Sequence, residues 1–374
     1  MRLVSTARLV DGVRLGRDVT SGVPGRAPLL RAGTTIRAEY RDALERHGIR
    51  AVYVDDDLSA GIEVPEALTE RTQAEAETAL HRAFEAAPMA LAAGKTLPAD
   101  TIADMKRVAH MIAADLAASG DAVLALADLA SSDAYTLQHS IDVTVLGLLL
   151  GRRVFNLYGW VNYRGGRSFD RIDERLATLG LGLLLHDVGK LIVPSTVLNK
   201  PGALDADEWE LIRSHPVAGI ELLPGDAINP LAKSVVRSHH ERWDGSGYPD
   251  GRAGTRISQL ARIASVADVY DAITSARPYR DARPAHVGYS AIVDGSGTEF
   301  DPEVVAAFRK VVAPYPVGTE ITLADGRRGI IASVPALTPE APVVRITHAA
   351  DGSLLDPFEV PLADLGDEGV QVAA

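Results

Sequence analysis

The chain has 374 residues, of which 47% are hydrophobic and 24% charged, the balance of an ordinary globular protein. It contains no cysteine, which excludes disulfides, thiolate metal sites and a cysteine nucleophile, so any metal must be held by histidines and carboxylates. The formal net charge of −12 argues against a protein whose main task is to bind long nucleic acid, but it leaves room for a small anionic ligand at a locally positive site.

The longest uncharged apolar runs, near Val143–Gly151 and Leu176–Leu185, are far shorter than the roughly 20 residues that a membrane-spanning helix needs. Met1–Ser5 does not lead into a long apolar core followed by small residues, as a signal peptide would. We therefore expect a cytoplasmic protein with no membrane span.

Residues 1–65 have the pattern of a small α/β accessory domain. Short alternating stretches at Arg2–Val10 and Val52–Asp55 are broken by Gly and Pro, as edge strands often are. They flank a helix-like run from Ala38 to His47, which Gly48 is placed to end.

Residues 66–313 are almost wholly helical in pattern, because apolar residues recur there at helical spacing. An alanine-rich helix is predicted from Glu66 to Ala93, with a break at Gly94–Ala99. Seven further helices are predicted, over Asp100–Ser119, Ala134–Phe155, Asp173–His186, Ala206–Ser214, Pro230–Trp243, Ile257–Ser275 and Pro302–Val312. Asn156–Asp170, rich in Gly, Asn, Arg and aromatic residues, is predicted to be an unusually long surface loop.

Residues 314–374 lose the helical pattern and are predicted to form a small C-terminal β unit. Asp325-Gly326 and Asp351-Gly352 are typical turn dipeptides. The predicted strands are Thr319–Leu323, Arg328–Val334 and Val343–His348. The fold class is therefore mainly α, with a helical-bundle domain between a small α/β unit and a small β unit.

The helical region holds a set of residues suited to metal binding. His186 and Asp187 end a strongly apolar helix, where polar groups are costly unless they are paired or metal-bound, and Gly189 permits a helix stop or a close backbone approach. Imidazole and carboxylate together suit first-row metal ions. The same region contains further candidate ligands at His139, His215, His239, His240 and Asp268.

His139, His215 and Asp268, each taken alone, are more often structural than functional, whereas the pairs His186-Asp187 and His239-His240 are not. Together, in one helical domain and beside the glycine-rich loop Asp244–Pro249, they predict a metal site. Asp187 is the natural candidate to bridge two metals.

The segment from about His139 to Arg280 resembles the HD-GYP family, a subset of the HD phosphohydrolase superfamily. The resemblance rests on His-Asp-Val-Gly-Lys at 186–190, on His-His-Glu-Arg-Trp-Asp-Gly-Ser-Gly-Tyr-Pro at 239–249, and on Asp268 followed by Asp271-Ala272. The family core covers about 134–302 and closes with Gly297–Pro302. The resemblance implies an HD-type helical bundle as the catalytic domain, within 66–313.

The resemblance also implies two divalent metal ions, Fe or Mn, that share Asp187. The implied ligands of the first are His139, His186, Asp187 and Asp268, and those of the second are Asp187, His215, His239 and His240. Some members bind a third metal through a Glu one turn before the first His. Tyr135 stands at that position here, so two metals are expected.

The activity implied is hydrolysis of cyclic di-GMP to pGpG, with GMP as a further product. Two cations a few ångströms apart lower the pKa of a shared water, and the resulting hydroxide attacks phosphorus. Lys190 and Asp187 are the expected catalytic residues, with Lys190 on the phosphate and the leaving oxygen. The expected substrate contacts are Lys190, Asp244, Tyr248, Arg277 and Arg280. The specificity for guanine follows from the resemblance alone.

Two alternatives stay open. The protein could be a cyclic-dinucleotide receptor or scaffold without turnover, or an HD phosphohydrolase acting on another nucleotide, such as (p)ppGpp or a dNTP. Asn156–Asp170 could lie over the mouth of the site, or be a surface loop without a role. The flanking units are candidates for homodimerisation or for docking a signalling partner.

Overall fold

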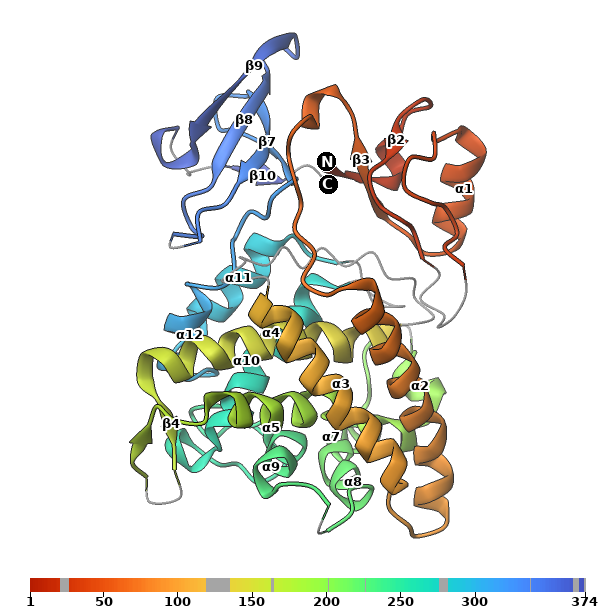
Figure 1. The fold of residues 1–374 in the computed structure, drawn as a ribbon, viewed down its shortest axis with the longest axis vertical. Helices are drawn as coiled ribbons and strands as arrows, with labels where there is room; N and C mark the ends of the chain where they lie inside the picture. Colours follow the sequence, from red (N-terminus) through yellow and green to blue (C-terminus); the bar gives the residue numbers. More distant parts are fainter. Residues whose placement is uncertain are drawn as a thin grey trace.

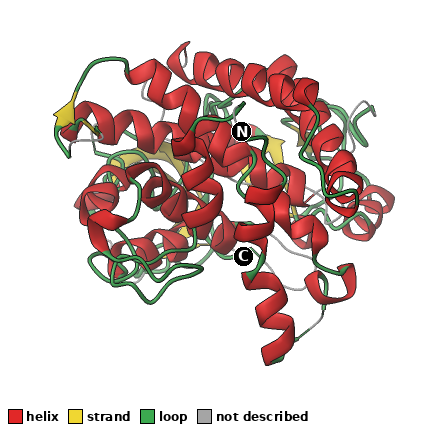
Figure 2. Ribbon diagram, turned by 90° about the horizontal axis from the view of Figure 1, so that it is seen from below, coloured by secondary structure: helices red, strands yellow, loops and turns green. Residues whose placement is uncertain are grey.

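The computed structural model describes all of the chain except residues 21–26, 119–134, 163–164, 201, 226, 276–281, 337, 366–369 and 373–374. It is mainly helical, as predicted. Figure 1 shows a layered set of helices below and two small strand-rich units side by side above it. Seen from below, helices fill most of the view and strands are few (Figure 2).

The N-terminal unit is a three-stranded antiparallel sheet covered by one helix. Its strands are β1 (Arg2–Ser5), β2 (Arg14–Leu15) and β3 (Ala51–Asp55), in the order β1-β3-β2. The helix α1 (Ala38–Arg46) ends before Gly48, whose φ of 74° is a conformation that glycine adopts at little cost. Apolar residues from the sheet and α1, including Leu15, Leu44 and Val54, form a core of their own.

The helical region contains eleven helices of the described chain. Pro at the first helical position, with an Asn or Asp cap before it, begins α9 and α12, as helix-start patterns predict. Their bounds are α2 (Glu70–Ala92), α3 (Ala99–Ala118), α4 (Tyr135–Tyr158), α5 (Ile172–Leu184), α6 (Ser195–Leu198), α7 (Ala206–Arg213), α8 (His215–Glu221), α9 (Pro230–Ser238), α10 (Gln259–Thr274), α11 (Ala285–Asp294) and α12 (Pro302–Phe308).

The helices α4, α5 and α10 form the centre of this region. α4 packs against α5 and α10, while α5 also packs against α3 and α9. The second half of α5 is buried from Leu179 to Leu184, and α10 is buried on nearly every face. The polar groups that these helices carry are therefore held away from water, where only paired or liganded groups are tolerated.

The C-terminal unit is a five-stranded antiparallel sheet in the order β10-β6-β7-β8-β9. The predicted strands correspond to β6 (Glu320–Thr322), β7 (Arg328–Ser333) and β8 (Val343–His348). The strands β9 (Leu354–Pro361) and β10 (Gln371–Val372) were not predicted. β9 is a mostly exposed edge strand that contains prolines, so it lacks the alternation that marks a half-buried strand.

The two flanking units contact each other, although the whole helical region, residues 66–313, separates them in sequence. The Leu3 N–H donates to the Gly318 carbonyl over 2.9 Å, and Arg2 forms an ion pair with Glu320. A guanidinium nitrogen of Arg345 lies 2.5 Å from the Ala60 carbonyl oxygen. Figure 1 shows both units at the same end of the helical region.

The prediction of a long loop at Asn156–Asp170 was wrong. Helix α4 runs on to Tyr158, and β4 (Trp160–Val161) then pairs with β5 (Arg167–Ser168). The indole N–H of Trp160 donates to the Asp170 carbonyl over 2.6 Å, and the Arg175 guanidinium lies 3.8 Å from the ring centroid. These contacts stabilise a short hairpin, which the polar composition of the segment did not reveal.

This hairpin lies far from His139. His139 is the fifth residue of α4, and the hairpin follows its last residue, so about 30 Å of helix separates them at 1.5 Å per residue. Figure 1 shows β4 at the lower left, beyond the end of α4. The described part of Asn156–Asp170 therefore does not cover the region around His139.

Two helices end four or five residues earlier than predicted. α9 ends at Ser238 rather than Trp243, and α12 ends at Phe308 rather than Val312. Beyond Ser238 the chain turns into a glycine-containing loop, and this places His239 and His240 at the helix end instead of inside it. The early end of α9 matters for the site, because side chains at a helix end can point along the axis.

Candidate metal centre

Seven side chains from five helical segments meet at the centre of the bundle. They form two groups whose ligand atoms lie within 4.8 Å of one another: His139, His186 and Asp268 in one, and Asp187, His215, His239 and His240 in the other. Six of the seven are buried, and His240 is partly exposed. All seven residues that the sequence pointed to are thus brought together.

Asp187 lies between the two groups and offers one oxygen to each. Its Oδ2 is 3.5 Å from Nε2 of His139 and 3.4 Å from Nε2 of His186. Its Oδ1 is 3.4 Å from Nε2 of His215 and 3.7 Å from Nε2 of His239. A carboxylate with its oxygens divided in this way is suited to bridging two cations.

Three of the histidines are oriented by the helices that they follow. The Nδ1 atoms of His186, His215 and His239 lie 2.7, 2.6 and 3.0 Å from backbone carbonyl oxygens. Those carbonyls belong to Leu183, Ile212 and Val236, in the last turns of α5, α7 and α9, where carbonyls lack the regular helical N–H partner four residues further on. Because a carbonyl only accepts, each Nδ1 carries the proton and each Nε2 has a free lone pair.

These lone pairs face one another. Nε2 of His186 lies 3.3 Å from Nε2 of His139, and Nε2 of His215 lies 3.3 Å from Nε2 of His239. Two facing lone pairs repel unless a proton or a cation lies near both. Oδ1 of Asp187 is buried and accepts no hydrogen bond from the described residues. The donor set therefore fits divalent cations, with imidazole nitrogen and carboxylate oxygen of the kind that first-row metals bind.

Asp271 supports the centre, and the sequence reasoning assigned it no role. Its Oδ2 lies 2.5 Å from Nδ1 of His139, and its Oδ1 accepts a hydrogen bond from Ser275 over 2.9 Å. A carboxylate on the far nitrogen orients a ligand histidine and raises its basicity. The spacing Asp268-x-x-Asp271, which puts both carboxylates on one face of α10, was the signal that could have revealed it.

Burial favours the neutral form of His186 and His215, and a nearby positive charge favours the ionised form of Asp187. Burial lowers the pKa of His186 to about 4 and that of His215 to about 3. Burial alone would raise the pKa of Asp187, but the positive charge of the nearby Lys190 ammonium holds it well below its usual range. Neutral imidazole and ionised carboxylate are the forms that bind metals.

These shifts predict that the metal-free protein loses stability as the pH falls below about 6.5, the pKa of an unfolded histidine. His186 and His215 take up protons less readily when folded, so stability is fully present above 6.5 and is lost as the pH falls toward their folded values. We expect a loss of about 2 kcal/mol per histidine at pH 5. Urea unfolding of chelator-treated protein at pH 7 and pH 5 measures it.

His186→Gln should weaken this pH dependence, whereas His110→Gln, at an exposed position of α3, should leave it unchanged. Equal urea midpoints at the two pH values would contradict the prediction.

A loop next to His240 borders the centre. The N–H groups of Trp243 and Asp244 donate to the carbonyls of Glu299 and Thr298 over 3.0 and 2.8 Å, which ties the loop to the segment before α12. A Cβ on Gly247 would lie 2.3 Å from the Arg242 nitrogen, so only glycine fits there. The tightly folded loop places the Tyr248 ring on the His240 ring, with centroids 4.7 Å apart.

Glu241 is a second residue that the sequence reasoning missed. It is buried, and its two carboxylate oxygens accept the backbone N–H groups of Asp250 and Arg252 over 2.8 and 3.0 Å. Glu241 therefore holds the residues that follow Pro249, at the far end of the loop. A buried acid directly after His239-His240 had no sequence signal of its own.

The predicted substrate contacts differ in their position relative to the metal centre. The Lys190 ammonium lies 2.6 Å from Oδ2 of Asp187, at the edge of the centre. Asp244 is exposed and its carboxylate accepts the Ser246 N–H over 2.9 Å, which makes it a cap of the loop. Arg277 and Arg280, and the side chain of Tyr135, lie outside the described residues.

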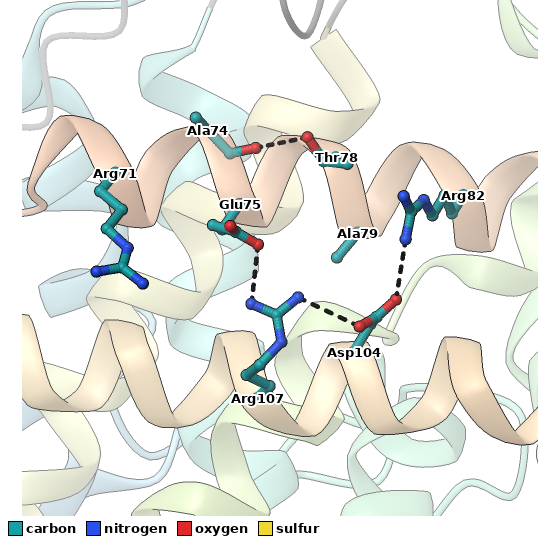
Figure 3. Close-up of a pocket in the computed structure, with 8 residues that line it drawn as sticks. All are labelled: Arg71, Ala74, Glu75, Thr78, Ala79, Arg82, Asp104 and Arg107. Carbon is teal, nitrogen blue, oxygen red and sulfur yellow. Dashed lines mark hydrogen bonds and ion pairs between the residues drawn. The ribbon is translucent and has the colours of Figure 1, made fainter.

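A surface pocket of about 310 Å³ lies elsewhere, between α2 and α3. Figure 3 shows Arg107 between Glu75 and Asp104, with Arg82 reaching the same Asp104. The pairs are 2.8 to 3.3 Å apart and exposed, so they form a charged surface ladder across the two helices. None of the seven residues of the centre lines this pocket.

Comparison with known proteins gives the following relations. Residues 159–304 match the family described as HD domain. A protein named cyclic di-GMP phosphodiesterase from Pseudomonas aeruginosa is 38% identical over 259 residues, which cover 69% of this chain and 58% of that protein. The cyclic di-GMP phosphodiesterase response regulator RpfG of Xanthomonas campestris is 42% identical over 137 residues, 36% of each chain.

A third relative is named 3′3′-cGAMP-specific phosphodiesterase 3, from Vibrio cholerae, and is 35% identical over 182 residues, 49% of this chain and 36% of that protein. The chain thus spans a little over half the length of the first relative and about a third of the other two. Among the described helices, none is both long and apolar enough to cross a membrane.

Proposed function

The chain contains an HD domain of the HD-GYP family, and from this premise we propose that it is a metal-dependent phosphodiesterase that hydrolyses cyclic di-GMP. The observation that carries the proposal is the carboxylate of Asp187, whose two oxygens are divided between two groups of histidines. The names of the Pseudomonas and Xanthomonas relatives support the choice of substrate.

We propose that two cations, Fe or Mn, are held here. His139, His186 and Asp268 would hold the first, His215, His239 and His240 the second, and Asp187 both. Cations at these positions supply Lewis acidity, which lowers the pKa of water and offsets phosphate charge. The chain itself supplies neutral imidazoles with their Nε2 lone pairs directed inward, a bridging carboxylate, and walls that keep bulk water out.

Lys190, Tyr248 and the two arginines act on the substrate in this proposal. The Lys190 ammonium is close enough to the centre to contact a phosphate oxygen and the leaving oxygen. Tyr248 lies against a ligand histidine, at the partly exposed side of the centre. Arg277 and Arg280 remain predictions of phosphate contact, since guanidinium groups suit bidentate binding. The proposed main product is linear pGpG.

The test is hydrolysis by the purified chain in Mn²⁺, or in Fe²⁺ without oxygen, with a chelator-treated control. Cyclic di-GMP, 3′3′-cGAMP, cyclic di-AMP, ppGpp and a dNTP are offered separately, and products are separated by chromatography. We expect pGpG from cyclic di-GMP, and two metal ions per chain by elemental analysis. Hydrolysis of ppGpp or dNTP alone would indicate another HD phosphohydrolase. Tight binding of cyclic di-GMP without product would indicate a receptor.

Lys190→Met should lower kcat for cyclic di-GMP by about 10²-fold or more, because a charge that stabilises the developing negative charge is lost. Metal content should stay near normal, since Lys190 supplies no metal ligand. Lys106→Met, which removes an exposed lysine of α3 that donates to the Ala227 carbonyl, should leave kcat unchanged. A Lys190→Met enzyme with a normal kcat would exclude the catalytic role.

We also propose three domains, at 1–65, 66–313 and 314–374. Three separate hydrophobic clusters support this division, each formed within one of these ranges. Homodimerisation or partner docking by the flanking units remains a prediction.

A further inference from the structure

We infer that Trp209 and Arg213 of α7, together with Tyr248, form a purine-binding surface at the mouth of the metal centre, in which Arg213 recognises guanine. The inference deepens the proposed function and rests on it, because it assigns base recognition, which the metal ligands cannot provide. The inference is based on contacts that connect the proposed metal ligand His240 to Tyr248 and then to Arg213 at the molecular surface.

The contacts begin at His240. The Tyr248 ring stacks on the His240 ring with centroids 4.7 Å apart and planes 27° from parallel. The guanidinium carbon of Arg213 lies 5.6 Å from the centroid of the Tyr248 ring, within the range of a cation–π contact. Arg213 is therefore next to the residue that lies against the centre, although it belongs to a different helix.

Helix α7 holds Arg213 in a defined place. A capping box between Asp205 and Glu208 begins the helix, and Lys200 pairs with Glu208 over 2.6 Å. At the other end, Nδ1 of His215 bonds to the Ile212 carbonyl. Arg213 lies between that carbonyl and the proposed ligand His215, so the metal centre and the Arg213 backbone are positioned together.

Trp209 extends the surface outward by one helical turn. It precedes Arg213 by four residues, so the two side chains lie on the same face of α7. Its side chain is 48% exposed, and α7 has no buried residue. Core packing thus does not account for an indole at this position, whereas a flat exposed aromatic ring beside a guanidinium suits a stacked base.

The chemistry of the pair favours guanine. Stacking of a base on an aromatic side chain contributes about 1–3 kcal/mol and is similar for all bases. Arginine donates two parallel hydrogen bonds to O6 and N7 of guanine, whereas adenine presents an amino donor in place of O6. The ion pair of Arg213 with Glu210 is 3.8 Å long and exposed, so the guanidinium can leave it at little cost.

The experiment measures binding of GMP and AMP to the Mn²⁺-loaded protein by titration calorimetry, because neither mononucleotide contains a phosphodiester that could be cleaved. We expect the wild type to bind GMP more tightly than AMP. Trp209→Ala should weaken both nucleotides about tenfold. Arg213→Ala and Arg213→Lys should each remove the preference for GMP, since lysine keeps the charge and loses the paired donors.

Two control variants should bind both nucleotides as the wild type does. Leu211→Ala changes an exposed residue of α7 two positions from Trp209, on another face, and Arg71→Ala removes an exposed arginine from the pocket between α2 and α3. Thermal unfolding of every variant checks that the fold is intact.

Unchanged affinities in the Trp209 and Arg213 variants would overturn the inference, and so would a wild type that binds neither nucleotide or binds AMP as tightly as GMP. Hydrolysis of cyclic di-GMP is measured separately on the same samples. A protein that prefers GMP through Arg213 and hydrolyses nothing would refute the proposed function alone. A protein that hydrolyses cyclic di-GMP with unaltered variants would refute the purine surface alone.

Discussion

Asp187→Asn is expected to lower phosphodiesterase turnover by at least about 10³-fold and to reduce bound metal. The substitution keeps the volume of the side chain and removes the charge that both groups of histidines share. Changing a residue that merely supports a ligand costs about 10–100-fold in metal affinity, and loss of a bridging ligand should cost more. Elemental analysis and the rate of cyclic di-GMP hydrolysis measure the two effects.

Asp173→Asn is the matched control, because it makes the same change at an exposed position near the start of α5, the helix that leads to Asp187. It should retain full metal content and rate. Wild-type metal content and turnover in Asp187→Asn would remove the basis of the proposed site.

Gly189→Ala is expected to have the second largest effect, through packing rather than chemistry. The segment Val188–Ile192 lies against α8, and a Cβ on Gly189 would lie 2.0 Å from the His215 carbonyl oxygen and 2.6 Å from the Gly219 nitrogen. Both are backbone atoms, so the clash can be relieved only by moving α8 away from His186-Asp187. Overpacking usually costs about 1–3 kcal/mol, and we expect at least the upper end of that range.

Because the movement separates His215 from Asp187, turnover should fall along with stability. Urea unfolding and cyclic di-GMP hydrolysis are measured on Gly189→Ala and on Gly225→Ala, where an added Cβ would meet no atom within 4 Å. Gly225→Ala should behave as the wild type. A Gly189→Ala protein as stable and active as Gly225→Ala would show that the approach of the two segments is not needed.

The sequence alone predicted only part of the role of Gly189. The sequence suggested a helix stop or a close backbone approach. The structure shows a close approach, in which Gly189 lies against the backbone of α8. The sequence did not predict α8 as a separate helix. This helix begins 26 residues further along the chain, and no local pattern states which turn of which helix Gly189 will meet.

The hairpin at β4 and β5 shows where local reasoning was wrong. Gly, Asn and Arg in Asn156–Asp170 are typical of a loop, but the Trp160 indole and the Arg175 guanidinium pack on each other and stabilise two short strands. This contact depends on where α5 begins relative to the end of α4. The placement of the hairpin away from His139 also followed from the length of α4, which continued three residues beyond its predicted end.

By itself, the sequence determined the mainly helical fold class and the set of residues able to bind metal, because helical periodicity and the two histidine motifs are local features. It also excluded sulfur ligands, since the chain has no cysteine. Only the tertiary structure decided which oxygen of Asp187 faces which histidines, that Asp271 orients His139, and that Arg213 lies beside Tyr248. Those relations depend on the packing of helices that lie up to about 130 residues apart, and packing at that range leaves no periodic trace in the sequence.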